Sequence, residues 1–170
     1  MMIRVSEILD TGVLVANPGD FPAPFADRSW RLEAVRLQVS RDDADVVVVG
    51  NLRASVPLVC GRCLEEFRVE VRPHVDARYV PRPVVPGDAT ELGADDLDVD
   101  FYDNDQLDLA TLVETEATLA LPMKPLCRAD CQGLCPVCGG NRNVVSCTCQ
   151  TRPPDPRLAV LKDVAERLRR

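Results

Sequence analysis

Eight cysteines constrain this 170-residue chain more than any other feature of its sequence. They form four closely spaced pairs: Cys60 and Cys63, Cys127 and Cys131, Cys135 and Cys138, Cys147 and Cys149. The first residues lack the apolar run of a signal peptide, and no segment has the length of a membrane span, so we expect a cytoplasmic protein without membrane contact. Disulfides rarely persist in the cytoplasm, and paired cysteines there are typical of metal sites.

The most specific motif is Cys135-Pro-Val-Cys138-Gly139. Two thiolates separated by two residues can bind one tetrahedral ion, and a glycine after the second cysteine permits a left-handed backbone conformation. Cys147 and Cys149 follow a few residues later and offer two further thiolates. We therefore predict a local four-thiolate zinc site from these two pairs.

The other two pairs form a second predicted zinc site, made of Cys60, Cys63, Cys127 and Cys131. We prefer this division because it uses every cysteine, and it predicts about two zinc ions per chain. An alternative division places four consecutive cysteines in one dense loop: Cys127, Cys131, Cys135 and Cys138.

Other interpretations of the cysteines remain open. An iron–sulfur cluster also takes cysteine ligands. A redox dithiol at residues 60–63 would need a helix N-terminus to lower a thiol pKa, whereas the neighbouring sequence predicts strands. Burial as small hydrophobic residues explains one or two cysteines but not eight in pairs. The single histidine, His74, lies in a strand pattern and is interpreted as structural.

Alternating polar and apolar residues predict antiparallel strands on either side of residues 60–63, which we place at a hairpin tip. The segments with this pattern are 32–39, 46–59, 67–71 and 75–79, and residues 97–103 also fit one strand. Residues 41–45 are predicted as a turn and residues 1–31 as largely irregular. Pro57 and Pro73 indicate strand ends or edge positions, because proline donates no hydrogen bond to a neighbouring strand.

A helix is predicted over residues 109–121, where Leu109, Leu112, Val113 and Leu119 have helical spacing, with Asp108 as its N-cap and Pro122 after its end. A last helix is predicted to begin at Asp155 and Pro156.

The expected fold is α+β: an antiparallel sheet or partly closed barrel with a packed helix and a zinc-stapled C-terminal segment. Residues 1–126 would form the α+β core, with an acidic insert at 81–108. Residues 127–170 would form the cysteine-rich zinc-binding segment and the C-terminal helix.

The charge is unevenly distributed along the chain. The formal net charge is −7, with −11 in residues 1–140 and +4 in residues 141–170. A chain this acidic is not a general nucleic-acid binder, because attraction to phosphates needs positive charge. Arg142 and Arg152, which flank predicted zinc ligands, are therefore the candidate contacts to RNA. Residues 88–108 hold nine Asp or Glu and no Lys or Arg, which indicates either a solvated loop or a docking surface for a basic partner.

We expect no enzymatic activity. The sequence has one histidine, no nucleophile elbow and no glycine-rich phosphate loop. Four-thiolate zinc sites are closed and lack the open coordination position that catalysis needs.

Four segments together resemble the YceD family, whose members are described as large ribosomal RNA subunit accumulation proteins. These segments are CGRCLEEF (60–67), ETEATLALPMKPLC (114–127), CQGLCPVCGGNRN (131–143) and DPRLAVL (155–161). The resemblance implies a factor that promotes accumulation of large-subunit ribosomal RNA and ribosome biogenesis. Its implied partner is that RNA or a pre-ribosomal particle, contacted directly or through a ribosomal protein.

Two alternative functions follow from the residues themselves. The chain is a protein-binding adaptor if the acidic insert contacts a basic ribosomal protein. It is a thiol redox or metal sensor if the cysteines change state.

Overall fold

A computed structural model describes residues 1–9, 11–82, 99–150 and 161. The chain divides into two compact units, which we describe separately. The first comprises Met1–Leu58 and Glu66–Pro125, and the second comprises Val59–Glu65 and Leu126–Arg170. None of the helices in the described part of the chain has both the length and the apolar composition that a membrane crossing requires.

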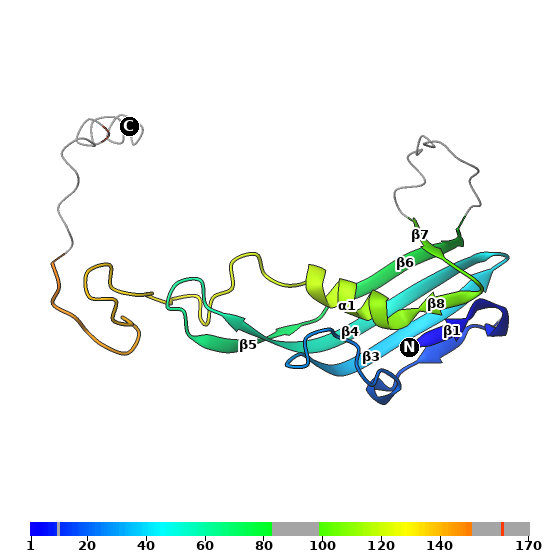
Figure 1. Ribbon diagram of the computed structural model, residues 1–170, viewed down its shortest axis with the longest axis horizontal. Helices are drawn as coiled ribbons and strands as arrows, with labels where there is room; N and C mark the ends of the chain where they lie inside the picture. The colour runs from blue at the N-terminus through cyan, green and yellow to red at the C-terminus, as the bar shows by residue number, and fades with distance from the viewer. Residues whose placement is uncertain (10, 83–98, 151–160, 162–170) are drawn as a thin grey trace. The chain divides into compact units, whose positions relative to one another are not determined.

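A six-stranded sheet forms most of the first unit (Figure 1). Its strand order is β2-β3-β4-β6-β7, and β5 also pairs with β4. The strands are β2 (Val13–Val15), β3 (Arg31–Asp42), β4 (Asp45–Val59), β5 (Glu66–Val71), β6 (His74–Pro81) and β7 (Val99–Tyr102). The predicted strands are thus all present, with the hairpin tip between β4 and β5.

The two prolines lie where strand pairing ends, as the sequence predicts. Pro57 lies beyond Ser55, the last β4 residue that pairs with β3. Pro73 lies between β5 and β6, which pair with β4 as separate strands.

Two features of the predicted sheet are wrong. The sheet is mixed, because β6 and β7 pair in parallel, with Tyr79 opposite Asp100. A parallel pair needs a connection of about a dozen residues or more, and the stretch between Pro81 and Val99 has that length. The sheet is also open rather than a partly closed barrel, since β2 and β7 lie at its two ends.

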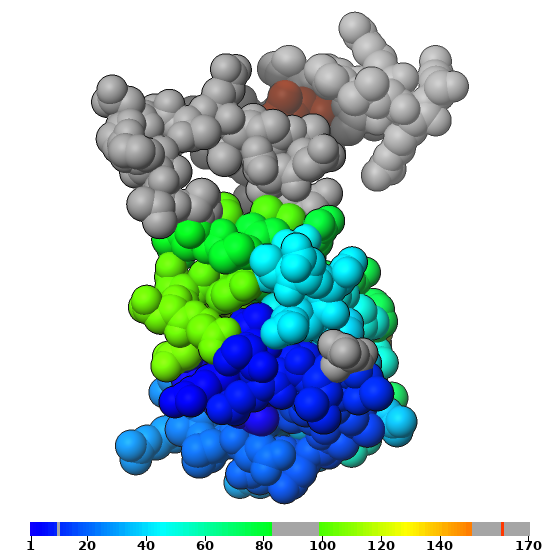
Figure 2. Space-filling model, turned by 90° about the vertical axis from the view of Figure 1, so that its right-hand side faces the viewer, coloured from blue at the N-terminus to red at the C-terminus, as the bar shows by residue number. Residues whose placement is uncertain are grey.

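The N-terminal residues are more ordered than predicted. β1 (Met2–Arg4) pairs antiparallel with β8 (Gln106–Asp108), and Figure 2 shows these N-terminal residues beside the residues that precede α1. Two short 3-10 helices, η1 (Val5–Glu7) and η2 (Pro18–Asp20), lie on either side of β2. Local pattern does not reveal β1, because its partner strand is about a hundred residues away in the sequence.

The predicted helix is present as α1 (Leu109–Leu119). Asp108 caps it, since its Oδ1 accepts a hydrogen bond of 2.9 Å from the backbone N–H of Ala110. Leu109, Leu112, Val113 and Ala117 are buried in the apolar core with side chains of the sheet. Leu119 is 75% exposed, so Ala117 takes the buried place in the last turn.

The second unit joins the hairpin tip to the cysteine-rich segment. Its described residues have little regular secondary structure beyond an isolated bridge between Leu134 and Asn141. Residues 59–65 belong to this unit although they come before residue 126 in the chain. The helix predicted from Asp155 lies outside the described residues.

Candidate metal centres

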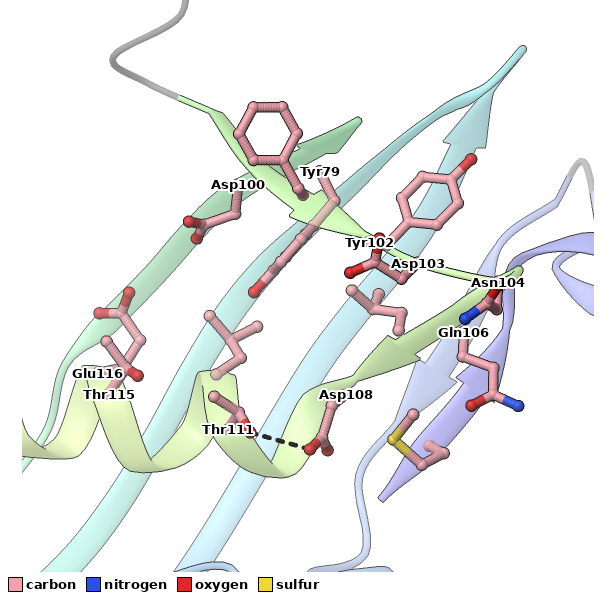
Figure 3. A pocket seen from close by; sticks show the side chains of 14 residues that line it. Tyr79, Asp100, Tyr102, Asp103, Asn104, Gln106, Asp108, Thr111, Thr115 and Glu116 are labelled. Carbon is pink, nitrogen blue, oxygen red and sulfur yellow. Dashed lines mark hydrogen bonds between the residues drawn. The ribbon is translucent and has the colours of Figure 1, made fainter. Parts of the chain in front are cut away.

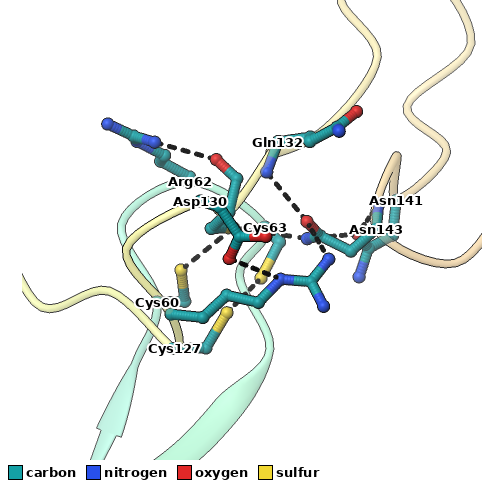
Figure 4. Close-up of polar contacts among 10 residues, drawn as sticks. Cys60, Arg62, Cys63, Cys127, Asp130, Gln132, Asn141 and Asn143 are labelled. Atoms are coloured by element: carbon teal, nitrogen blue, oxygen red, sulfur yellow. Dashed lines mark hydrogen bonds and ion pairs between the residues drawn. The ribbon is translucent and has the colours of Figure 1, made fainter.

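The first cysteine cluster consists of Cys60, Cys63, Cys127 and Cys131, and its four sulfur atoms lie within 4.8 Å of one another (Figure 4). Sγ of Cys60 is 3.8 Å from Sγ of Cys131, and Sγ of Cys63 is 3.6 Å from Sγ of Cys127. These separations are far longer than a disulfide bond. Four sulfurs at about 2.3 Å from one tetrahedral ion lie about 3.8 Å apart, so the cluster has the dimensions of a single-ion site.

The second cysteine cluster consists of Cys135, Cys138, Cys147 and Cys149, and its sulfur atoms also lie within 4.8 Å of one another. It is more open than the first cluster: Cys138 and Cys149 are exposed, whereas Cys60, Cys63 and Cys131 are buried. All of its ligand candidates come from one short stretch of chain, so the cluster can form locally.

The same backbone turn positions the first cysteine pair of each cluster. The N–H of Leu64 donates to the carbonyl of Cys60 (3.0 Å), and the N–H of Gly139 donates to the carbonyl of Cys135 (2.9 Å). Both donors have a positive φ, 60° at Leu64 and 71° at Gly139. The predicted left-handed glycine is confirmed, and the equivalent role of Leu64 has no signal in the sequence because leucine rarely adopts this conformation.

Electrostatics within the first cluster lower the pKa of two thiols, Cys60 and Cys131, and raise the pKa of the other two. The backbone N–H groups of Cys63 and Cys127 lower the pKa of the Cys60 thiol to about 6. Burial, and then hydrogen bonding with the neighbouring thiols, raises the pKa of Cys127 to about 12.

The thiols of the second cluster also differ from one another in pKa. The backbone N–H groups of Cys138 and Val137 lower the pKa of Cys135 to about 6. The Cys138 thiol, followed by burial, raises the pKa of Cys149 to about 12. Four adjacent thiolates repel one another unless a cation lies between them, so the fully ionised form of either cluster needs a metal ion.

Asn143 connects the two clusters. It lies between Cys138 and Cys147 in the sequence, yet its Nδ2 donates to Sγ of Cys131 over 3.2 Å. Its Oδ1 accepts from the backbone N–H of Gln132 and from Nη2 of Arg128, both at 2.8 Å. The sequence did not mark Asn143 as functional, because this contact depends on how the two loops meet.

Arg62 ties the hairpin tip to the cysteine-rich segment. Its Nη1 donates to the carbonyl of Cys131 (2.8 Å), and its own carbonyl accepts from the N–H of Leu134 (3.1 Å). The side chain and the backbone carbonyl of Arg62 therefore both connect residues 60–63 to the segment that carries Cys131.

Comparison with known proteins gives the family. A family model described as large ribosomal RNA subunit accumulation protein YceD matches residues 48–165, more than half of the chain and all eight cysteines. The chain belongs to the YceD family. The resemblance seen in the sequence is thereby confirmed.

Curated relatives extend this likeness to mycobacteria. Uncharacterized proteins of Mycobacterium bovis and Mycobacterium tuberculosis are 31% identical over 103 residues, which is 61% of this chain and 48% of theirs. A protein of Mycobacterium leprae is equally identical over the same length, which is 46% of its own chain. The chain thus spans about half the length of the curated relatives it matches. No solved structure was found to match it.

In this YceD-family chain the eight thiols form the two groups of four that we preferred from the sequence. The four cysteines of the alternative division are shared between the two clusters rather than gathered in one. His74 lies in β6, where its Nδ1 is 3.2 Å from Oδ1 of Asn51, and it belongs to neither cluster. Metal binding itself stays a prediction.

Of the two candidate RNA contacts of this YceD-family chain, the structure describes Arg142. Arg142 is exposed, and its backbone N–H donates to the carbonyl of Gly133 (2.9 Å), which holds it beside the second cluster. Arg152 lies outside the described residues.

Proposed function

We propose that the chain is a non-enzymatic cytoplasmic factor that promotes accumulation of large-subunit ribosomal RNA and carries two structural zinc ions. The family match over residues 48–165 is the observation that supports the ribosomal role. The two clusters of four thiols support the zinc.

The donor set favours zinc or a single iron ion over other metals and over an iron–sulfur cluster. All-thiolate tetrahedral sites select zinc or iron, whereas calcium and magnesium require oxygen ligands. An iron–sulfur cluster places several ions between its thiolates and spreads them apart, and the 3.6 and 3.8 Å separations suit a single ion better. Four protein ligands leave no open coordination position, so such zinc would stabilise the fold rather than catalyse a reaction.

The negative net charge of the chain limits which of its surfaces can bind RNA. Two four-thiolate zinc sites change the formal net charge from −7 to about −11. We therefore propose that contact with large-subunit RNA or a pre-ribosomal particle is made by the basic segment 141–170, beginning with Arg142, or through a basic ribosomal protein.

A genetic experiment tests this function. Deleting the gene in its host should lower the ratio of large-subunit to small-subunit ribosomal RNA, and the wild-type gene should restore it. An unchanged ratio, with unchanged subunit profiles on sucrose gradients, would refute the ribosomal role. RNA binding at graded salt then separates the two routes, because only direct phosphate contacts give a steep salt dependence.

The adaptor is the second candidate. The described part of the acidic insert has three exposed aspartates close together in the sequence: Asp100, Asp103 and Asp105. Unaltered RNA affinity after Arg142→Glu, together with retained ribosome association, would favour it. If the chain is instead a thiol redox or metal sensor, mild oxidation should change the reactivity of its thiols and lower its metal content.

A further inference from the structure

An acidic groove of about 480 Å³ lies in the first unit (Figure 3). Residues of β7, β8 and α1 form its walls, and Tyr79 of β6 reaches into it. Its volume falls within the range of ligand pockets. Among the described residues that line it, none is a lysine, arginine or histidine.

Tyr79 is the polar group that marks this groove as a binding site. Its side chain is only 8% exposed, and Figure 3 shows the ring directed into the groove. Within the part of the chain that the structure describes, no residue forms a hydrogen bond with its hydroxyl. The hydroxyl is not a buried atom without a partner, so it is open to solvent at the groove surface. The ring of Tyr79 is thus buried while its hydroxyl is reached by solvent, so a ligand in the groove can bond to it in place of water.

Two carboxylates flank this hydroxyl. Asp100 is the residue opposite Tyr79 in the β6–β7 pairing, and Glu116 faces the groove from α1. Neither is in an ion pair with a described residue. By contrast, Asp103 is paired with Arg82 at 2.9 Å. The uncompensated charge of the groove is therefore concentrated at Asp100 and Glu116.

The pKa of the Tyr79 hydroxyl reflects the negative charge of the groove. Burial, and then the negative charges of Asp100, Glu116 and Asp108, raise the pKa of Tyr79 to about 12. The phenol is therefore protonated at neutral pH, and its oxygen can accept a hydrogen bond from a ligand in a region of negative potential. Such a region attracts a cationic donor and repels phosphate.

The rest of the groove suits a long side chain. Apolar residues help to line it: Leu107 and Leu112 are buried, with 2% and 4% exposure, and Phe101 is exposed. Lysine and arginine bury an aliphatic stem along apolar surface while their charged ends remain polar. The remaining walls carry neutral amides and hydroxyls, from Gln106 and Thr115 among others, which can bond to a peptide backbone.

We propose that this groove binds a lysine or arginine side chain presented by a basic protein segment, with the cation between Asp100 and Glu116 and bonded to the Tyr79 hydroxyl. A free polyamine fits less well. It carries ammonium groups along its whole length, whereas the groove offers a single place with two carboxylates that are not in ion pairs, at Asp100 and Glu116. The inference concerns the first unit alone and holds whether or not the chain binds RNA or metal.

Fluorescence anisotropy of a labelled lysine- and arginine-rich peptide, added to the full chain, tests the proposal. Glu116→Gln should weaken binding about tenfold, as expected for loss of a charged hydrogen-bond partner. Tyr79→Phe keeps the ring and should weaken binding about fivefold. Asp76→Asn is the matched charge control. Asp76 lies three residues before Tyr79 in β6, so its side chain is on the opposite face of the sheet. Its effect should stay below about twofold.

Three results would overturn the proposal. The first is an equal loss of affinity in Glu116→Gln and Asp76→Asn, which would mean that net charge alone attracts the peptide. The second is unchanged binding in both Glu116→Gln and Tyr79→Phe. Spermidine, as a competitor at equal ionic strength, should displace the peptide only weakly, and tighter binding of spermidine than of the peptide would also refute a protein partner. Circular dichroism of each variant confirms that the fold is retained.

Discussion

Asn143 donates from its side-chain amide to the sulfur of Cys131 over 3.2 Å, although Asn143 lies in the loop closed by the other cysteine cluster. A hydrogen bond to a thiolate stabilises its charged form and orients it toward a metal. A hydrogen bond from this amide, followed by one from the Gly133 N–H, acts against burial to lower the pKa of Cys131. The second cluster thus helps to complete the first.

Asn143→Ala should therefore weaken metal binding at the first cluster about 10–100-fold, the usual effect of losing a hydrogen bond to a ligand. Competition with a chromophoric chelator measures this affinity. Gln132→Ala is the control, since only the backbone N–H of Gln132 takes part in these bonds. Equal affinities of the Asn143 variant and the wild type would contradict the coupling.

Metal content is the most direct prediction. We expect about two zinc ions per chain, from eight thiols at four per tetrahedral site. Elemental analysis gives the metal, and thiol titration with and without a chelator gives the number of free cysteines. One ion per chain with four reactive thiols would exclude two occupied sites, and one iron in place of zinc would correct the choice of metal.

The two clusters should respond differently to loss of one ligand. Cys135→Ser should loosen residues 135–149, because the ligands of that cluster all lie in this stretch. Cys60→Ser should instead release residues 59–65 from residues 126–131, which the first cluster joins. Hydrogen exchange distinguishes the two patterns, and the sheet of the first unit should stay protected in both. Identical exchange in the two variants would argue against separate sites.

The sequence predicted those features that depend on local pattern. Strands β3 to β6, the Asp108 cap and the left-handed Gly139 all follow from residues within a few positions of one another. The parallel pairing of β6 with β7 and the contact of Asn143 with Cys131 join segments that no local pattern links. The same holds for the groove around Tyr79, whose walls come from three elements. Spacing alone allowed two divisions of the cysteines, and the tertiary fold gathers the thiols in one of them.

The matching turns at Leu64 and Gly139 predict opposite effects of substitution. Gly139→Ala should cost about 1 kcal/mol, because a Cβ at this φ is strained while nothing lies within 4 Å of it. Leu64→Gly should relieve a similar strain and lose little packing, since Leu64 is 63% exposed. Chelator concentrations at half metal loss measure both effects. A Leu64→Gly variant that loses metal more readily than the wild type would show that the Leu64 side chain has a role of its own.

Asp108 gives the first unit a pH-dependent contribution to stability. Although burial raises the pKa of this carboxyl, the bonds from Thr111 and from the N–H of Ala110 outweigh it, and the pKa lies below its ordinary value of 3.8. The carboxylate form thus stabilises the folded state, an effect that is fully present above the unfolded pKa and is lost as the pH falls through the folded one. Asp108→Ala should cost about 1 kcal/mol at pH 7, as loss of an N-cap does, and much less in acid below the folded pKa. Urea unfolding of the first unit, followed by the fluorescence of Trp30 at both pH values, measures the difference. Asp76→Asn is the control for a general charge effect, and a cost of Asp108→Ala that does not change between neutral and acidic pH would show that the ionised carboxylate does not stabilise α1.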